Sequence, residues 1–153
     1  MDLQLKSAIQ DYLNKADLEN TLAVTLTMKQ KKDAEYLDLY NSKKNFRHFM
    51  NRMNERVYGN AFKRFQKRIG VIPVIEFSQN NRLHYHLVME RPEKVSEVLF
   101  PHMIESCWKK TRFGHHQVDI QKTYSSEWID YITKFKSSDD QVDWDSFHWN
   151  RWL

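Results

Sequence analysis

Residues 71–90 read VIPVIEFSQNNRLHYHLVME, two runs of β-branched and aromatic residues on either side of a polar turn. Such runs predict two antiparallel strands, Val71–Ser78 and Arg82–Glu90, that are joined by a short loop. Asn81 in this loop tolerates the left-handed conformation that a three-residue hairpin loop requires. Proline lacks the N–H that a central strand needs, so Pro73 indicates an edge position or a bulge in the first strand.

The segments outward from this hairpin follow helix and strand periodicities. Ser42 is expected to cap one helix that bends at Gly59 and ends at Gly70, while Pro92 begins the next and Pro101 restarts it. Apolar spacing predicts the following elements: helices over residues 5–16, 42–69, 92–108 and 125–136, and strands over 21–29 and 113–122.

These elements follow one another in the order β-α-β-β-α-β, the split β-α-β pattern of ferredoxin-like and RRM-like folds. We expect an α+β fold, with an antiparallel sheet of four to five strands, helices on one face and the other face open. A length of 153 residues suits a single domain over 1–153. Its core is expected at about 20–136, between an N-terminal helix in 1–19 and an acidic, tryptophan-rich tail at 137–153.

The composition excludes several classes of protein. Three glycines and three prolines do not fit a collagen-like or low-complexity chain. No apolar run approaches the ~18 residues that span a bilayer, and charges throughout Met1–Ala16 leave no signal-peptide core. A lone Cys107 cannot form an internal disulfide. We therefore expect a cytoplasmic protein with no membrane partner.

Positive charge is concentrated in one part of the chain. The segment Lys29–Arg68 holds twelve lysines and arginines and four acidic residues, a net charge of +8, whereas the whole chain carries only +4. A basic segment on an otherwise acidic chain favours a polyanionic partner such as nucleic acid. The alternative is a solvated helix face without a partner.

The histidines of the second hairpin strand form the clearest chemical pattern. Alternate residues of a strand share a face, so His84 and His86 point together while Tyr85 points to the core. If Ser78 pairs with Arg82, Glu76 of the first strand falls opposite His84 on the same face. Two imidazoles and a carboxylate with open positions suit Mn²⁺, Mg²⁺ or a related cation. The alternative is a set of ordinary surface side chains.

The predicted last helix contributes a second reactive pair. Tyr131 and Lys134 lie on one stripe at the rim of its apolar face. A phenol there can attack a phosphodiester, and the lysine can stabilise the developing charge or protonate the leaving group. A packing tyrosine with a solvated hydroxyl is the alternative, and Tyr124 is the rival nucleophile.

In their order along the chain, these motifs resemble those of the HUH endonucleases, specifically the rolling-circle replication initiators (Rep proteins). The resemblance covers residues 20–136 and rests on four motifs: Thr25-Leu26-Thr27, Glu76, His84-Tyr85-His86 and Tyr131-Ile132-Thr133-Lys134.

The resemblance implies a metal-dependent endonuclease and strand transferase that acts on single-stranded or hairpin origin DNA. Glu76, His84 and His86 would hold Mn²⁺ or Mg²⁺, and Tyr131 would form a 5′-phosphotyrosine while Lys134 assists. The freed 3′-hydroxyl would prime rolling-circle replication of a plasmid or virus wherever that replicon is copied. A separate or host helicase would be required, and the oligomeric state stays open.

Two other functions stay open from the residues alone. One is a single-tyrosine HUH transposase, and the other is a non-catalytic RRM-like module that binds nucleic acid. In either enzyme, polar and basic side chains are expected to contact the DNA. These are Thr25, Thr27, Lys29, Lys31, Lys32, Lys43, Lys44, Arg47 and Arg82.

Overall fold

The structure is a computed structural model that describes Ser7, Asp11 and residues 20–77, 82–122 and 141–150. Most of the predicted helix over 5–16 and all of the predicted helix over 125–136 lie outside the described residues. The helices are α2 (Leu39–Tyr58), α3 (Asn60–Phe65) and α4 (Leu99–Lys109). The strands are β1 (Thr21–Met28), β2 (Lys31–Lys32), β3 (Glu35–Tyr36), β4 (Val71–Phe77), β5 (Leu83–Glu90), β6 (Gly114–Lys122) and β7 (Gln141–Val142).

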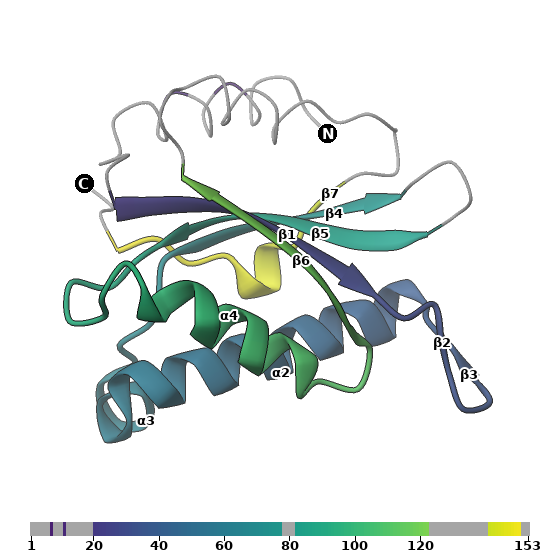
Figure 1. The fold of residues 1–153 in the computed structure, drawn as a ribbon, viewed down its shortest axis with the longest axis horizontal. Helices are drawn as coiled ribbons and strands as arrows, with labels where there is room; N and C mark the ends of the chain where they lie inside the picture. Colours follow the sequence, from purple (N-terminus) through teal and green to yellow (C-terminus); the bar gives the residue numbers. More distant parts are fainter. Residues whose placement is uncertain (1–6, 8–10, 12–19, 78–81, 123–140, 151–153) are drawn as a thin grey trace.

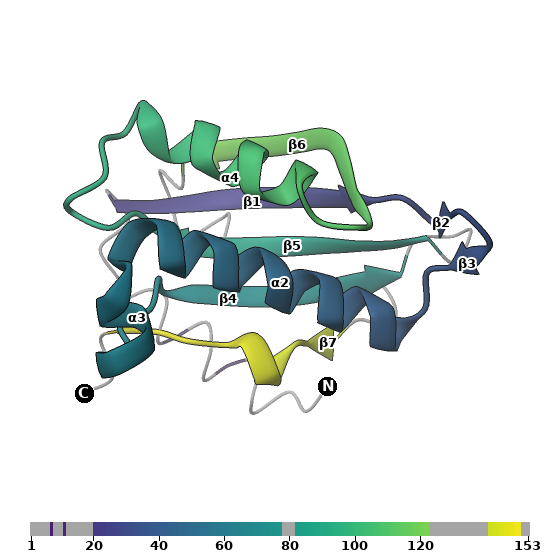
Figure 2. The same ribbon diagram turned by 90° about the horizontal axis from the view of Figure 1, so that it is seen from below.

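The described residues form a five-stranded antiparallel sheet in the order β6-β1-β5-β4-β7. Helices α2 and α4 both cover one face of this sheet (Figures 1 and 2). The predicted β-α-β-β-α-β order is therefore confirmed as an α+β fold with its helices on one side. Strand β5 is the central strand, and β6 and β7 are the two edges.

The hairpin of β4 and β5 has the predicted register, with Glu76 opposite His84 and Phe77 opposite Leu83. Pro73 lies near the sheet edge as expected, because only the two-residue β7 pairs with the outer side of β4. Its carbonyl accepts a hydrogen bond from the backbone of Asp143, whereas its missing N–H costs no ladder bond to β5.

The core lies between the sheet and α2. Alternate residues of β1 and β5 point into it, so Leu26, Tyr85 and Leu87 are fully buried. The Tyr85 ring stacks on Phe46 of α2, with 4.3 Å between the ring centroids. Cys107 of α4 is buried in the same cluster. One face of each strand is thus fixed by burial, and the intervening residues are directed to the other face.

Helix α2 begins earlier than predicted, because Asp38 and not Ser42 is its cap. The Asp38 carboxylate accepts a hydrogen bond from the Asn41 backbone N–H at 2.7 Å. Ser42 instead lies inside the helix on its buried face. The expected break at Gly59 is present, since its φ of 54° lies in the left-handed region and separates α2 from α3.

The predicted ends of two helices were also wrong. Helix α3 ends at Phe65, where Gln66 takes the left-handed conformation, well before Gly70. Residues 92–98 form turns, and α4 begins at Leu99. Pro101 lies in the first turn of α4, where helix N–H groups have no partner within the helix. No helix among the described residues is long and apolar enough to cross a membrane.

The tail contributes a strand that the sequence did not predict. Beyond β7, the chain pairs with Val71 through His148, and Trp149 is buried. The side chain of Asp143 is also fully buried, and it accepts a hydrogen bond from the Tyr85 hydroxyl at 2.9 Å. Burial raises the pKa of the Asp143 carboxyl. Residues 141–150 therefore belong to the packed domain, although Trp144 remains about half exposed.

Candidate metal centre

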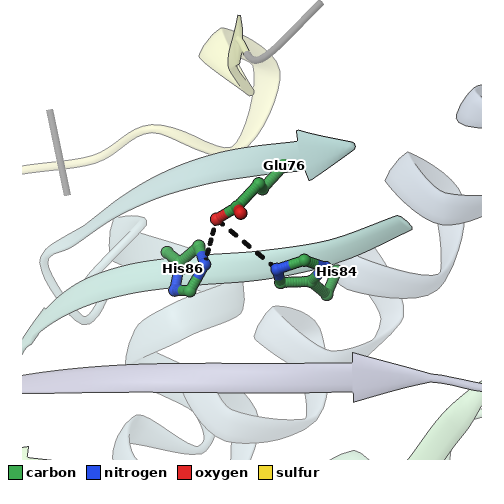
Figure 3. Close-up of side chains that lie close together, drawn as sticks. All are labelled: Glu76, His84 and His86. Atoms are coloured by element: carbon green, nitrogen blue, oxygen red, sulfur yellow. Dashed lines mark ion pairs between the residues drawn. The ribbon is translucent and has the colours of Figure 1, made fainter. Parts of the chain in front are cut away.

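Glu76, His84 and His86 converge on the face of the sheet opposite the helices (Figure 3). One carboxylate oxygen of Glu76 faces the Nε2 atoms of both histidines, at 3.4 Å from His84 and in closer contact with His86. Strand alternation causes this convergence, because the histidines lie two residues apart on β5 and Glu76 is the cross-strand partner of His84. Each of the three side chains is 80% or more buried.

Strand β1 supplies the threonines that flank this cluster. Thr27 is the cross-strand partner of His84, and Thr25 is the partner of His86. The Thr25 hydroxyl lies 3.1 Å from Nδ1 of His86. The tautomer with its proton on Nδ1 donates to this hydroxyl and leaves the Nε2 lone pair facing Glu76. Such an outer contact orients an imidazole for metal binding.

A glutamine that sequence reasoning missed extends the ladder beside the cluster. The Gln30 side chain accepts a hydrogen bond from the Leu83 N–H at 3.0 Å and donates to the Leu83 carbonyl at 3.1 Å. Its amide also donates to the Met28 carbonyl at 2.9 Å. In this way Gln30 replaces the next backbone pair after Thr27 and His84. Only a long-range contact creates this role, and no local sequence pattern marks it.

Trp108 of α4 supports the cluster from the other layer. Its indole N–H donates to the carbonyl of Thr27 at 2.8 Å. The Tyr85 side chain, which lies between the two histidines in sequence, is anchored in the core by Asp143. The strands that carry the cluster are therefore held by backbone ladders on one side and by buried polar contacts on the other.

A groove of about 310 Å³ adjoins the cluster at His84. Partial burial, followed by the charges of His116, Lys29 and Arg82, lowers the pKa of His115 in its wall. A neutral imidazole can both donate and accept a hydrogen bond. The groove is lined by Thr25, Thr27, Met28, Gln30, Arg82, Leu83, His84, His115 and Gln117. Neither His115 nor Gln117 was among the predicted site residues.

The structure divides the predicted DNA-contact residues into two groups. Thr25, Thr27 and Arg82 line the groove, and the charge of Lys29 acts on His115 in its wall. Lys31 and Lys32 form β2, just after the end of β1. The remaining three cations belong to α2, which covers the opposite face of the sheet (Figure 2). These are Lys43, Lys44 and Arg47.

The predicted catalytic residues Tyr131 and Lys134 lie outside the described residues, as does the rival nucleophile Tyr124. Their positions relative to the metal cluster stay a prediction from the sequence. The described strands that precede and follow this part of the chain are β6, which ends at Lys122, and β7, which begins at Gln141.

The donor set of the cluster fits a divalent cation. Two imidazole nitrogens and one carboxylate oxygen all lie within 4.8 Å of one another, so a single ion can contact all three. Nitrogen and oxygen ligands with open positions are typical of non-structural divalent sites. The adjoining groove leaves room for a ligand on the side of His84.

Comparison with known proteins is consistent with this site. Residues 21–140 match the family model of the replication-associated protein ORF2, a match that covers every described element from β1 onward but not the residues after 140. No curated protein and no solved structure matches the chain. Since the match spans most of the 153 residues, the chain belongs to the replication-associated protein ORF2 family.

Proposed function

We propose that this replication-associated protein initiates rolling-circle replication by nicking and rejoining single-stranded DNA with a tyrosine nucleophile. The observation that carries the proposal is the convergence of Glu76, His84 and His86 beside a polar groove. The HUH motifs that the sequence resembles provide the same three residue types in the same order.

The cluster would hold Mn²⁺ or Mg²⁺ against the scissile phosphate. When bound, the cation polarises the phosphoryl oxygens and stabilises the charge that develops on them. Thr25 keeps the His86 ring in its ligating orientation. Arg82 contacts the phosphate on the groove side, and Gln117 and His115 offer hydrogen bonds to the adjoining nucleotide.

Tyr131 supplies the nucleophile in this proposal. Its phenolic oxygen forms a bond to phosphorus while the bond from phosphorus to the 3′-oxygen breaks. Lys134 protonates the departing 3′-oxygen, so the products are a 5′-phosphotyrosine and a free 3′-hydroxyl. Attack by a 3′-hydroxyl on the phosphotyrosine reverses the chemistry and joins the strands.

The described strands are compatible with a tyrosine over the cluster. Lys122 and Gln141 stand on the two opposite edges of the sheet, and the histidine strand β5 is midway between them. Tyr131 is the ninth residue after Lys122 and the tenth before Gln141. Four strand spacings amount to about 19 Å, which the intervening 18 residues can span even as a helix of about 27 Å.

The family match favours replication over transposition, since replication is what the family description states. The composition of the open face favours chemistry over a non-catalytic binding module. Such modules stack bases on aromatic side chains, whereas the described face around the groove presents Thr25, Thr27, Glu76, His84 and His86.

A denaturing gel tests the proposal. The protein is incubated with Mn²⁺ and a diverse pool of labelled single-stranded and hairpin DNA. We expect a covalent, slower-migrating band with the wild type and none with Tyr131→Phe, although this variant still binds the pool. Tyr124→Phe is the matched control and is expected to keep the band.

Three results would count against the proposal. A band that persists in Tyr131→Phe and disappears in Tyr124→Phe would move the nucleophile to Tyr124. A band of equal intensity in EDTA would remove the metal from the mechanism. Binding without a band in any protein, with pools that include the replicon's own origin, would favour the binding module.

A further inference from the structure

The outer side of α2 and α3 carries a dense set of cations on the face of the sheet opposite the metal cluster. The chain from Leu39 to Arg68 contains nine lysines and arginines and a single acidic residue, Glu55. Eight of the nine cations are exposed. We call these eight the basic ridge: Lys44, Arg47, Arg52, Arg56, Lys63, Arg64, Lys67 and Arg68.

Helical spacing places the α2 members of the ridge on one side. The residues that α2 buries include Phe46, Phe49 and Met53, which face the sheet. Lys44, Arg47, Arg52 and Arg56 recur three to five residues apart on the solvent side, over about 18 Å of helix. In Figure 2, α2 runs along the exposed side of the helix layer, with α3 at its C-terminal end.

These charges are only weakly compensated within the described chain. The one acidic residue, Glu55, forms an ion pair with Lys63 at 3.3 Å. For the other ridge cations, the described parts of the chain contain no ion-pair partner. Because folding gathers like charges here at an electrostatic cost, a polyanion that covers the ridge is stabilised in return.

From this arrangement we propose that the basic ridge binds the phosphate backbone of double-stranded DNA, independently of sequence. Duplex DNA presents about one charge per 1.7 Å of axis, so a charged ridge of this length meets several phosphates. A single strand is a poorer fit, because stacking platforms for bases need exposed rings. Of the large apolar side chains on α2 and α3, Tyr40 and Phe65 are exposed, and they lie near the two ends of this pair of helices.

The proposal rests on the proposed function only in naming DNA as the polyanion, and it assigns the two faces to different parts of the substrate. The groove beside His84 receives the single strand that is cut, and the ridge holds the adjoining duplex. The thickness of the sheet and of α2 separates the two surfaces, so one short single strand does not contact both.

Binding of a labelled 20-base-pair duplex tests this role in EDTA, where no cleavage takes place. The variant is the triple substitution Arg52→Gln, Arg56→Gln and Arg64→Gln, and the matched control is Arg→Lys at the same three positions. We expect the Gln variant to bind the duplex at least about tenfold more weakly, with a salt dependence reduced by about three charges. The Lys control should bind within about threefold of the wild type.

Two further probes and one stability control make the test decisive. Thermal unfolding must show the same midpoint for both triple variants, which separates charge from misfolding. An unchanged duplex affinity of the Gln variant would overturn the proposal. So would an equal loss of binding to a 20-nucleotide oligothymidine, or tight binding to phosphatidylserine vesicles without binding to the duplex. The Gln variant should still form the covalent band on a short single strand, whose loss would point to the cleavage site instead.

Discussion

The two faces of the sheet have opposite chemistry. The open face gathers a carboxylate, two imidazoles and two hydroxyls around a groove, and its residues are held by cross-strand pairing. The helix face buries an apolar core and presents the basic ridge to solvent. This difference indicates that a high density of positive charge does not mark the reactive site. Few, well-oriented groups perform chemistry, whereas many mobile cations provide affinity for phosphates.

The largest expected effect separates the two faces by activity. His84→Ala should lower Mn²⁺-dependent cleavage of a short single strand by about a thousandfold or more, because the cation loses a ligand. Arg52→Gln on the ridge, the matched control, should change that rate by less than about twofold. Cleavage is measured by gel under single-turnover conditions. Equal losses in both variants would contradict the division of labour between the faces.

A second prediction concerns the glutamine that aligns the site. Gln30→Ala leaves the N–H of Leu83 without its side-chain partner and should lower the free energy of unfolding by about 1–3 kcal/mol. Mn²⁺ affinity should fall as well, since His84 follows Leu83 directly. Urea unfolding and calorimetric titration measure the two effects. Gln121→Ala, on the exposed edge strand, is the control and should change stability by less than about 0.5 kcal/mol.

The third prediction concerns the groove. Arg82→Gln should weaken binding of a short single strand about tenfold, because one phosphate contact is lost, while Mn²⁺ affinity stays the same. Fluorescence anisotropy in EDTA measures the first quantity. Lys122→Gln, which removes a cation at the far end of β6, serves as the comparison and should have little effect. If the two variants lose affinity equally, the groove does not bind the strand.

The smallest expected effect lies beneath the site, at the buried Asp143. Burial raises its pKa in the folded protein above the usual value of about 3.9. Between these two values the folded state binds more protons than the unfolded state, so this group's contribution to stability falls as pH rises. Asp143→Asn should therefore gain about 1 kcal/mol relative to the wild type on going from pH 4 to pH 7. Urea unfolding at both pH values checks this, and a difference that is independent of pH would disprove it.

The metal cluster could be predicted because every step toward it depends on period-two alternation. A three-residue loop and one buried face fixed the register of β4 and β5, and with it the position of Glu76 opposite His84. Strand β7 could not be foreseen, because two residues carry no periodicity and only their contacts with β4 order them. The α2 cap was misassigned because Asp38 and Ser42 lie within about one turn, and packing selects between them.

The sequence identified the cations but not the face on which they lie. Lys43, Lys44 and Arg47 were predicted with Arg82 as contacts for one DNA strand, yet α2 places them across the sheet from the groove. Net charge along the chain carries no direction in space, so only the packing of α2 against β1 and β5 could reveal two separate surfaces.

The central claim is that Glu76, His84 and His86 hold the cation used for nicking. Anomalous diffraction at the manganese edge, from crystals grown with Mn²⁺, tests it most directly. One peak is predicted per chain, in contact with the Nε2 atoms of both histidines and a carboxylate oxygen of Glu76, and absent from crystals of His84→Ala. A peak elsewhere on the protein, or no peak at saturating Mn²⁺, would contradict the claim.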